Sequence, residues 1–341
     1  MFRQTALKTL TMIGLLAAGV FYAWAGGYYA GELVVQAAVL AILAIGLDLA
    51  AGYGGMISLC HGAIFGISAY VFAGMTVRLG ISPLLGFPAA ILAAAVFGLA
   101  VGAVTSRTKG IFFIMATLAF GEMVHAYVFA STALGGDDGL TGVKRLDLAA
   151  IGINLENPIQ FALFALAALA VAYVAAALVL RSGFGRALVG IRSNEIRMRA
   201  LGLPVWRYKA AAFGMSGAIA GLAGAIAAQH LMFVSPELLV WTVSGEALVV
   251  VILGGLGTLA GPALGAAIFV FLKHEVSRVT DHWHMVVGIV LIATVLSGGR
   301  GIFGQIEHYA ERRAARRRSR PDTASEDLAE SPANPEGGRH A

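Results

Sequence analysis

The chain contains long, continuous apolar runs separated by short stretches that carry most of its charge. A helix needs about 20 apolar residues to cross the hydrocarbon core of a membrane. The runs are unbroken rather than alternating, which favours membrane helices over a β-barrel. We expect about ten membrane segments, of which the eighth and ninth are short for a complete crossing. The runs lie at residues 7–26, 33–51, 56–77, 84–105, 111–131, 159–180, 210–230, 243–255, 262–273 and 285–296.

The composition supports this interpretation. Hydrophobic residues make up 58% of the chain and charged residues only 13%, whereas about 25% of the residues of a soluble domain are charged. We therefore expect an all-α, polytopic transmembrane helical bundle that includes short or broken helices. Cys60 is the only cysteine, so a disulfide within the chain and a thiolate metal site are excluded.

The basic residues indicate how the bundle is oriented. Lys and Arg are enriched in cytoplasmic loops. Here they precede the first run, follow the fourth and the last, and crowd into the stretch 181–209 after the sixth. With about ten crossings these positions share one side, so both termini are expected to be cytoplasmic. The net charge of +5 suits this orientation and contact with anionic membrane lipid; we do not interpret it as nucleic-acid binding.

The basic stretch 181–209 also has the pattern of a short helix outside the membrane. Asn194 can cap its start, Glu195 suits the positive end of a helix, and Gly202 can end it. The expected apolar face consists of Ile196, Ala200 and Leu203. A half-apolar helix outside the bilayer is expected to dock onto another protein.

Two glycine-rich stretches, 52–62 and 254–262, interrupt the apolar runs. The second lacks the Lys of a P-loop. It therefore predicts either a tight turn between two closely packed short helices or a broken helix that lines a pathway. Ser58 and His61 fall in the first stretch at about membrane depth, where polar groups normally face the bundle interior. His61 can be a satisfied structural histidine or a pathway residue.

Two acidic residues within the apolar runs complete the candidate pathway set of Ser58, His61, Glu122 and Glu246. Glu122 and His125 share a helical face, but E-x-x-H metal ligands come in sets, and the chain has no second copy. We expect a buried carboxylate near an inner cavity, and no metal site. The chain also lacks a P-loop and a nucleophile–base arrangement, so no catalytic residue and no cofactor are expected.

Several of these stretches resemble the LivM-type permeases of branched-chain amino acid ABC importers. The resemblance covers about 31–304 and rests on motifs in the order of the family, at residues 52–70, 135–142, 192–209, 216–225 and 254–265. Cys60 departs from the family, which usually has Gly at that position.

The resemblance implies the parts of a larger machine. A homologous H-type permease would complete the pathway, two cytoplasmic P-loop ATPases would hydrolyse ATP, and a periplasmic binding protein would deliver the amino acid. The chain itself would be a multi-pass subunit of a bacterial inner membrane and not an enzyme. The coupling contacts to the ATPase would be made by Asn194, Glu195, Ile196, Ala200, Leu201 and Gly202.

The resemblance also suggests three parts of the chain and leaves alternatives open. Residues 1–30 would be an N-terminal transmembrane helix with the first outer loop, 31–305 the permease domain, and 306–341 a disordered basic, then polar, tail.

Urea, short-chain amide and aromatic acid permeases share much of the pattern. An ion-coupled secondary transporter would instead use buried ionisable groups such as Glu122 and His125, and a membrane scaffold would not transport.

Overall fold

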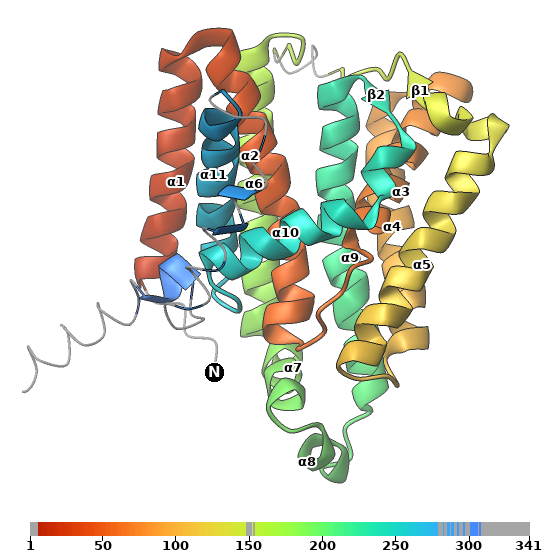
Figure 1. Ribbon diagram of the computed structural model, residues 1–341, viewed down its shortest axis with the longest axis vertical. Helices are drawn as coiled ribbons and strands as arrows, with labels where there is room; N and C mark the ends of the chain where they lie inside the picture. The colour runs from red at the N-terminus through yellow and green to blue at the C-terminus, as the bar shows by residue number, and fades with distance from the viewer. Residues whose placement is uncertain are drawn as a thin grey trace, which may run out of the picture. The chain divides into compact units, whose positions relative to one another are not determined.

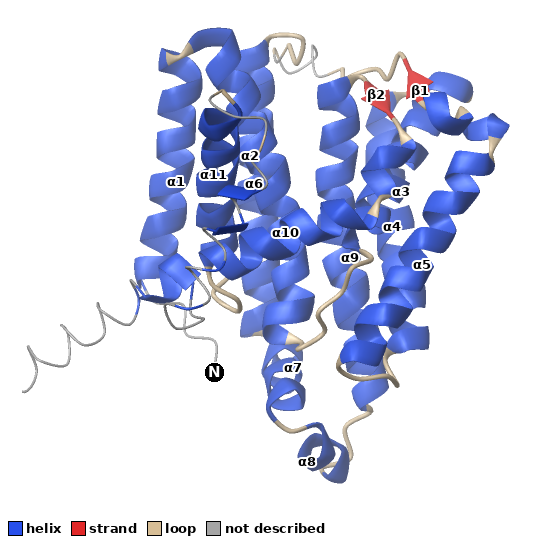
Figure 2. Cartoon of the chain, in the orientation of Figure 1, coloured by secondary structure: helices blue, strands red, loops and turns tan. Residues whose placement is uncertain are grey.

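The computed structural model describes residues 6–147, 152, 154–278, 282, 285–286, 288–289, 292, 296, 301–305 and 307. The tenth expected run, 285–296, and the expected tail, 306–341, lie largely outside these residues. Within the described part of the chain the structure is mostly helical, with one short pair of strands (Figure 2).

Six of the described helices are long and apolar enough to cross a membrane. This confirms a multi-pass helical bundle, while the total of about ten segments stays a prediction. The six are α1 (Ala6–Ala25), α2 (Gly27–Asp48), α4 (Pro83–Thr105), α5 (Ile111–Ala130), α6 (Pro158–Arg181) and α9 (Val205–Leu231). The spans of α2 and α9 are each 78% buried and that of α1 only 17%, so α2 and α9 form the centre of the bundle.

The turn between α1 and α2 is tighter than the sequence suggested. Only Gly26 separates the two helices, so the residues from Gly27 onward belong to α2 and form no outer loop. Gly27 has φ +67, a conformation that residues with a Cβ rarely adopt. Two glycines therefore reverse the chain within a few residues.

Short helices fill the regions around the glycine breaks. The third expected run becomes helical only at α3 (His61–Ala73), which ends in a π-helical turn, η2 (Gly74–Arg78); a similar turn, η1 (Leu49–Tyr53), extends α2. α10 (Trp241–Gly254) runs across the long helices (Figure 1). Its 14 residues span about 21 Å, less than the ~30 Å hydrocarbon core. A turn connects it to α11 (Gly261–Ser277).

Small residues let the long helices approach closely, as is typical of membrane bundles. A Cβ atom on Gly102 of α4 would lie 2.6 Å from the Cβ of Phe213 on α9, and one on Gly224 of α9 would lie 2.0 Å from the carbonyl oxygen of Phe65 on α3. The contacts of α9 with α3 and α4 therefore depend on the absence of side chains at these positions.

The two ends of the bundle differ. At one end, which we call the basic end, α7 (Gly183–Ser193) and α8 (Glu195–Ala200) extend beyond the long helices (Figure 1). At the opposite end, β1 (Leu140–Thr141) pairs antiparallel with β2 (Phe233–Val234). The remaining short elements are 3₁₀ turns at that end, η3 (Thr132–Leu134), η4 (Gly136–Asp138) and η6 (Pro236–Leu239).

Candidate functional site: the α8 segment and the glycine breaks

The short helix predicted in the basic stretch forms as α8. The side chain of Asn194 accepts a hydrogen bond from the backbone N–H of Arg197 at 2.9 Å and caps its start. Gly202 follows the helix with φ +81, the left-handed conformation that commonly ends a helix. The start and end signals read from the sequence are therefore confirmed.

Apolar side chains of the α8 segment point into solvent. Ile196 is 76% exposed and Leu201 is 71% exposed. Met198 instead turns inward and packs against Gly190 of α7. A Cβ atom added to Gly190 would lie only 2.8 Å from the methyl group of Met198. Of the expected apolar face, Ile196 and Ala200 are exposed and Leu203 is half-buried. The helix α8 that carries Ile196 and Ala200 lies beyond the ends of the long helices (Figure 1).

Glu195 ties α8 to two other segments of the basic end. Its carboxylate lies 3.1 Å from Nζ of Lys109, in the loop between α4 and α5, and 3.0 Å from Nζ of Lys209, on α9. Arg199 completes the cluster at 2.8 Å. Burial raises the pKa of Glu195, but the hydrogen bonds and charges of Lys209 and Lys109 outweigh it and hold the pKa below its usual value.

The two glycine breaks contact each other directly above this cluster. Asp48, at the end of α2, is fully buried and accepts hydrogen bonds from the backbone N–H of Gly257 at 2.6 Å and of Leu259 at 3.1 Å. Arg192, at the end of α7, donates to the carbonyl oxygen of Gly52. A Cβ on Gly52 would lie 2.6 Å from the nitrogen of Gly257. Both breaks are therefore joined to each other and to the base of the α8 segment.

A small pocket of about 310 Å³ opens between these parts. Its walls come from the first glycine break, the loop between α4 and α5, and the junction of α7 with α8. They include Gly55, Lys109, Arg192, Glu195 and Lys209. Movement of α8 would therefore change the space below the first break.

Ser58 and His61 lie inside the bundle. Both are fully buried. The Nε2 atom of His61 is 2.7 Å from the hydroxyl oxygen of Ser216, which donates to the carbonyl oxygen of Gly46. Ser58 accepts from the backbone N–H of Cys60 at 3.1 Å. The geometry of His61 is that of a histidine linking α3, α9 and α2.

Glu122 and Glu246 are half-buried. The Glu122 side chain is 45% exposed and lies 3.8 Å from His125, but its Oε1 atom is buried without a hydrogen-bond partner among the described residues, so the carboxylate is only partly buried. The Glu246 side chain is 39% exposed and lies 3.4 Å from Nζ of Lys273. Among the described residues, the ion pairs and hydrogen bonds of these two acids do not reach Ser58 or His61. The four candidates are therefore not brought together into one cluster.

In the sequence, Asp48 falls within the apolar run 33–51 and Arg192 within the basic stretch 181–209, and neither pattern connects these residues to the glycine breaks. Their partners lie 209 and 140 residues away along the chain. The sequence shows an acid, an arginine and two glycine-rich stretches, but it does not show which of these residues contact each other.

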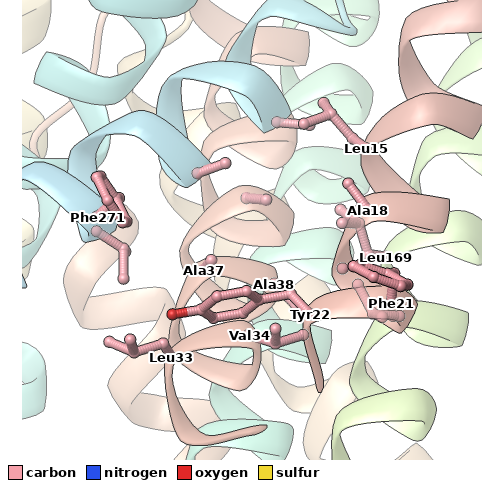
Figure 3. A pocket seen from close by; sticks show the side chains of 16 residues that line it. Leu15, Ala18, Phe21, Tyr22, Leu33, Val34, Ala37, Ala38, Leu169 and Phe271 are labelled. Carbon is pink, nitrogen blue, oxygen red and sulfur yellow. The ribbon is translucent and has the colours of Figure 1, made fainter. Parts of the chain in front are cut away.

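A separate cavity of about 450 Å³ lies between α1, α2, α6 and α11 and is lined almost entirely by apolar side chains (Figure 3). Tyr22 presents its hydroxyl there, and Leu33 and Phe271 are among the apolar neighbours. None of the candidate site residues lines this cavity.

Comparison with known proteins places these features in a family. The family described as "branched-chain amino acid transport system / permease component" matches residues 29–295. The chain is 26% identical to permease protein LivM of the high-affinity branched-chain amino acid transport system of Salmonella typhimurium and of Escherichia coli K12, over 88% of this chain and 76% of each relative. It is 28% identical to permease protein LsrC of the autoinducer 2 import system of Yersinia pseudotuberculosis, over 78% of this chain and 75% of the relative.

No solved structure matches the chain. The family match covers most of the sequence, including both glycine breaks and α8. The chain belongs to the permease family of branched-chain amino acid ABC importers and is of the LivM type.

Proposed function

We propose that the chain is one of two homologous membrane subunits of an ATP-driven importer for branched-chain or related amino acids, located in a bacterial inner membrane. A periplasmic binding protein delivers the substrate, and two cytoplasmic P-loop ATPases supply the energy. The basic end then faces the cytoplasm. The H-type permease is the second membrane subunit.

The observation that carries this proposal is the exposure of two large apolar side chains, Ile196 and Leu201, on one short segment beyond the long helices. Exposed apolar surface of this kind is suited to binding another protein. Asn194 fixes the start of this segment and Glu195 ties it to the bundle. The segment therefore presents a preformed surface for the groove of an ATPase, together with Ala200 and Gly202.

The contacts of the basic end suggest how the segment passes on the motion of the ATPases. Glu195 connects α8 to Lys109 and Lys209, and Arg192 connects α7 to the first glycine break. Asp48 extends this connection to the second break. When ATP binding brings the two ATPases together, the α8 segments move with them, and the breaks at the ends of α2 and α10 shift. The pathway then opens to the other side, in the manner of a domain rearrangement between two packed states.

Co-purification from mild detergent tests the coupling contact. The chain is expressed with its partner subunits, as wild type and as the double variant Ile196→Arg and Leu201→Arg, which leaves Glu195 in place. We expect the wild type to carry a P-loop ATPase and the variant to lose at least nine-tenths of it, because two charges replace the apolar surface. Arg197→Gln, an exposed change on the same helix, is the matched control. ATPase binding by the double variant at the wild-type level would contradict the proposal.

The substrate is proposed from the family description and from the LivM relatives. Because the LsrC relative serves an autoinducer import system, the substrate class needs its own measurement. Uptake of labelled leucine, isoleucine and valine is compared with uptake of urea, short-chain amides and aromatic acids by the assembled transporter. Saturable uptake of the three branched-chain amino acids is expected, and uptake of only another class would reassign the substrate within the same family.

A further inference from the structure

A polar cavity of about 920 Å³ lies at the end of the bundle opposite α8. Two of its lining residues show this location: Pro158 starts α6, and His230 is near the end of α9. Since α9 has 27 residues, about 40 Å of helix separates the cavity from the basic end. Its walls also include Glu32 of α2 and the segment that follows β1.

One wall of the cavity carries two cations, Lys144 and Arg145, next to two acids, Asp147 and Glu156. The guanidinium of Arg145 donates hydrogen bonds to the carbonyl oxygens of Leu155 at 2.7 Å and Gln229 at 3.1 Å, and its Cζ lies 4.7 Å from the centre of the Phe161 ring. These backbone acceptors hold the guanidinium in place. The neighbouring Lys144 is exposed and lines the same cavity. Lys144 and Arg145 are the groups of this wall that can bind a carboxylate.

The acidic group Glu32 lines the same cavity and is connected to the Phe161 ring through His230. His230, whose side chain is 7% exposed, stacks on Phe161 with ring centres 5.8 Å apart. Its Nε2 atom is 3.0 Å from Oε1 of Glu32, whose side chain stays 39% exposed. Phe161 thus contacts both the Arg145 guanidinium and the His230 ring, which is paired with Glu32. The open part of Glu32 is suited to an ammonium group.

The cavity is preformed by hydrogen bonds of the surrounding backbone. The backbone N–H of Leu146 donates to the side-chain oxygen of the fully buried Gln229 at 2.9 Å, and that of Val143 donates to Met232 at 3.2 Å. The antiparallel pairing of β1 with β2 joins the same two segments of the chain a second time. Rigid walls with a few placed charges and apolar surface are the usual features of a small-molecule site.

We propose that this cavity is a reception site for an α-amino acid in its zwitterionic form. The ligand carboxylate lies toward Lys144 and Arg145, its ammonium group toward Glu32, and its apolar side chain against the exposed Tyr28 and Met232. The mixed charge of the walls disfavours anions such as phosphate as well as polyamines. The site deepens the proposed import function, on which it rests, because it gives the released amino acid a first position on the permease.

Ligand binding to the assembled permease and ATPase complex, without the binding protein, tests the site. Saturation-transfer NMR is measured with leucine, with isopentylamine, which lacks the carboxylate, and with 4-methyl-2-oxopentanoate, which lacks the ammonium group. We expect Lys144→Ala to weaken leucine binding about tenfold and to leave isopentylamine unchanged. We expect Glu32→Gln to weaken leucine binding similarly and to leave the oxo acid unchanged.

Arg78→Gln is the matched control, because Arg78 is an exposed cation that does not line the cavity. Lys144 is exposed, so its replacement tests the site even if Glu32→Gln disturbs folding. Leucine binding that is absent, or equal in all variants, would overturn the reception site. A Lys144→Ala complex that binds leucine normally but binds the binding protein weakly would assign this surface to docking instead.

Failure of the reception site and failure of the proposed function give different results. Leucine uptake by the wild-type transporter together with unchanged binding in the variants removes the site and leaves the function. No uptake of any amino acid by the complete wild-type transporter removes the function.

Discussion

At the scale of single residues, Asp48 has the largest structural role among the ionisable groups of the bundle interior described here. Its carboxylate accepts two backbone N–H groups in a fully buried setting. One of them belongs to Leu259, whose φ of 64 costs energy for a residue with a Cβ. The carboxylate thus stabilises a backbone conformation that the sequence around Leu259 would not adopt alone.

Asp48→Asn should therefore destabilise the chain. An amide offers one acceptor oxygen instead of two, so one buried N–H loses its partner, at a cost of about 2 kcal/mol in the free energy of unfolding. The melting temperature of the purified protein in detergent is the measurement. Asp137→Asn, at an exposed acid in η4, should change the free energy of unfolding by less than about 0.5 kcal/mol. Equal melting of both variants would show that Asp48 is not required for the second break.

Glu195 predicts a pH dependence of the basic end. Its pKa is lowered in the folded chain, so its ion pairs contribute fully above the usual glutamate value of about 4.3 and are lost as pH falls through the lowered pKa. Hydrogen exchange of amides in α8 and in the loop 106–110 measures this. Glu195→Gln should exchange faster than the wild type at neutral pH and match it once the wild-type carboxylate is protonated. Arg197→Gln should behave as the wild type throughout; a Glu195→Gln variant that also did so at neutral pH would show that these ion pairs do not hold α8.

At the scale of elements, the sequence predicted the long helices and α8 well and the short helices poorly. Length and hydropathy identify a spanning helix, and Asn194 and Gly202 give local signals for the ends of α8. The start of α3 is held by two distant serines. Ser216 and Ser244 lie 155 and 182 residues from their hydrogen-bonding partners His61 and Gly62. Helices that are apolar on all sides carry no periodic signal for their packing partners.

The contact between α3 and α9 gives a test at this scale. Gly224→Ala would place a Cβ 2.0 Å from the carbonyl oxygen of Phe65, so backbone has to move, and we expect a loss of about 1–3 kcal/mol in the free energy of unfolding. Gly14→Ala on α1 is the control, since a Cβ there meets nothing within 4 Å. It should leave stability unchanged or raise it by up to about 1 kcal/mol. A Gly224→Ala protein that melts like Gly14→Ala would show that α3 and α9 are not closely packed.

At the scale of the whole molecule, the central helices α2 and α9 connect two chemically different ends. The basic end carries the exposed α8 segment, which we propose as the docking surface and which is connected through Arg192 to the first glycine break. The opposite end carries a charged cavity held by Gln229 and the β1–β2 pair. A transporter driven from one end by a separate energy source needs this division, whereas one driven by ions needs ionisable groups within the bundle. Glu122 and Glu246 are half-buried, and their ion pairs among the described residues are with His125 and Lys273.

The energy source distinguishes these two kinds of transporter directly. We expect leucine uptake by cells expressing the complete transporter to change less than about twofold when a protonophore collapses the proton gradient while ATP is maintained. Depletion of ATP with the gradient maintained should abolish uptake, because the α8 segment then has no moving partner. Glu122→Gln should leave uptake near the wild-type level, since the ATP-driven mechanism does not use this carboxylate, whose ion pair is with His125 at 3.8 Å. Uptake that follows the proton gradient, and is lost in Glu122→Gln, would establish ion coupling and remove the ATP-driven mechanism.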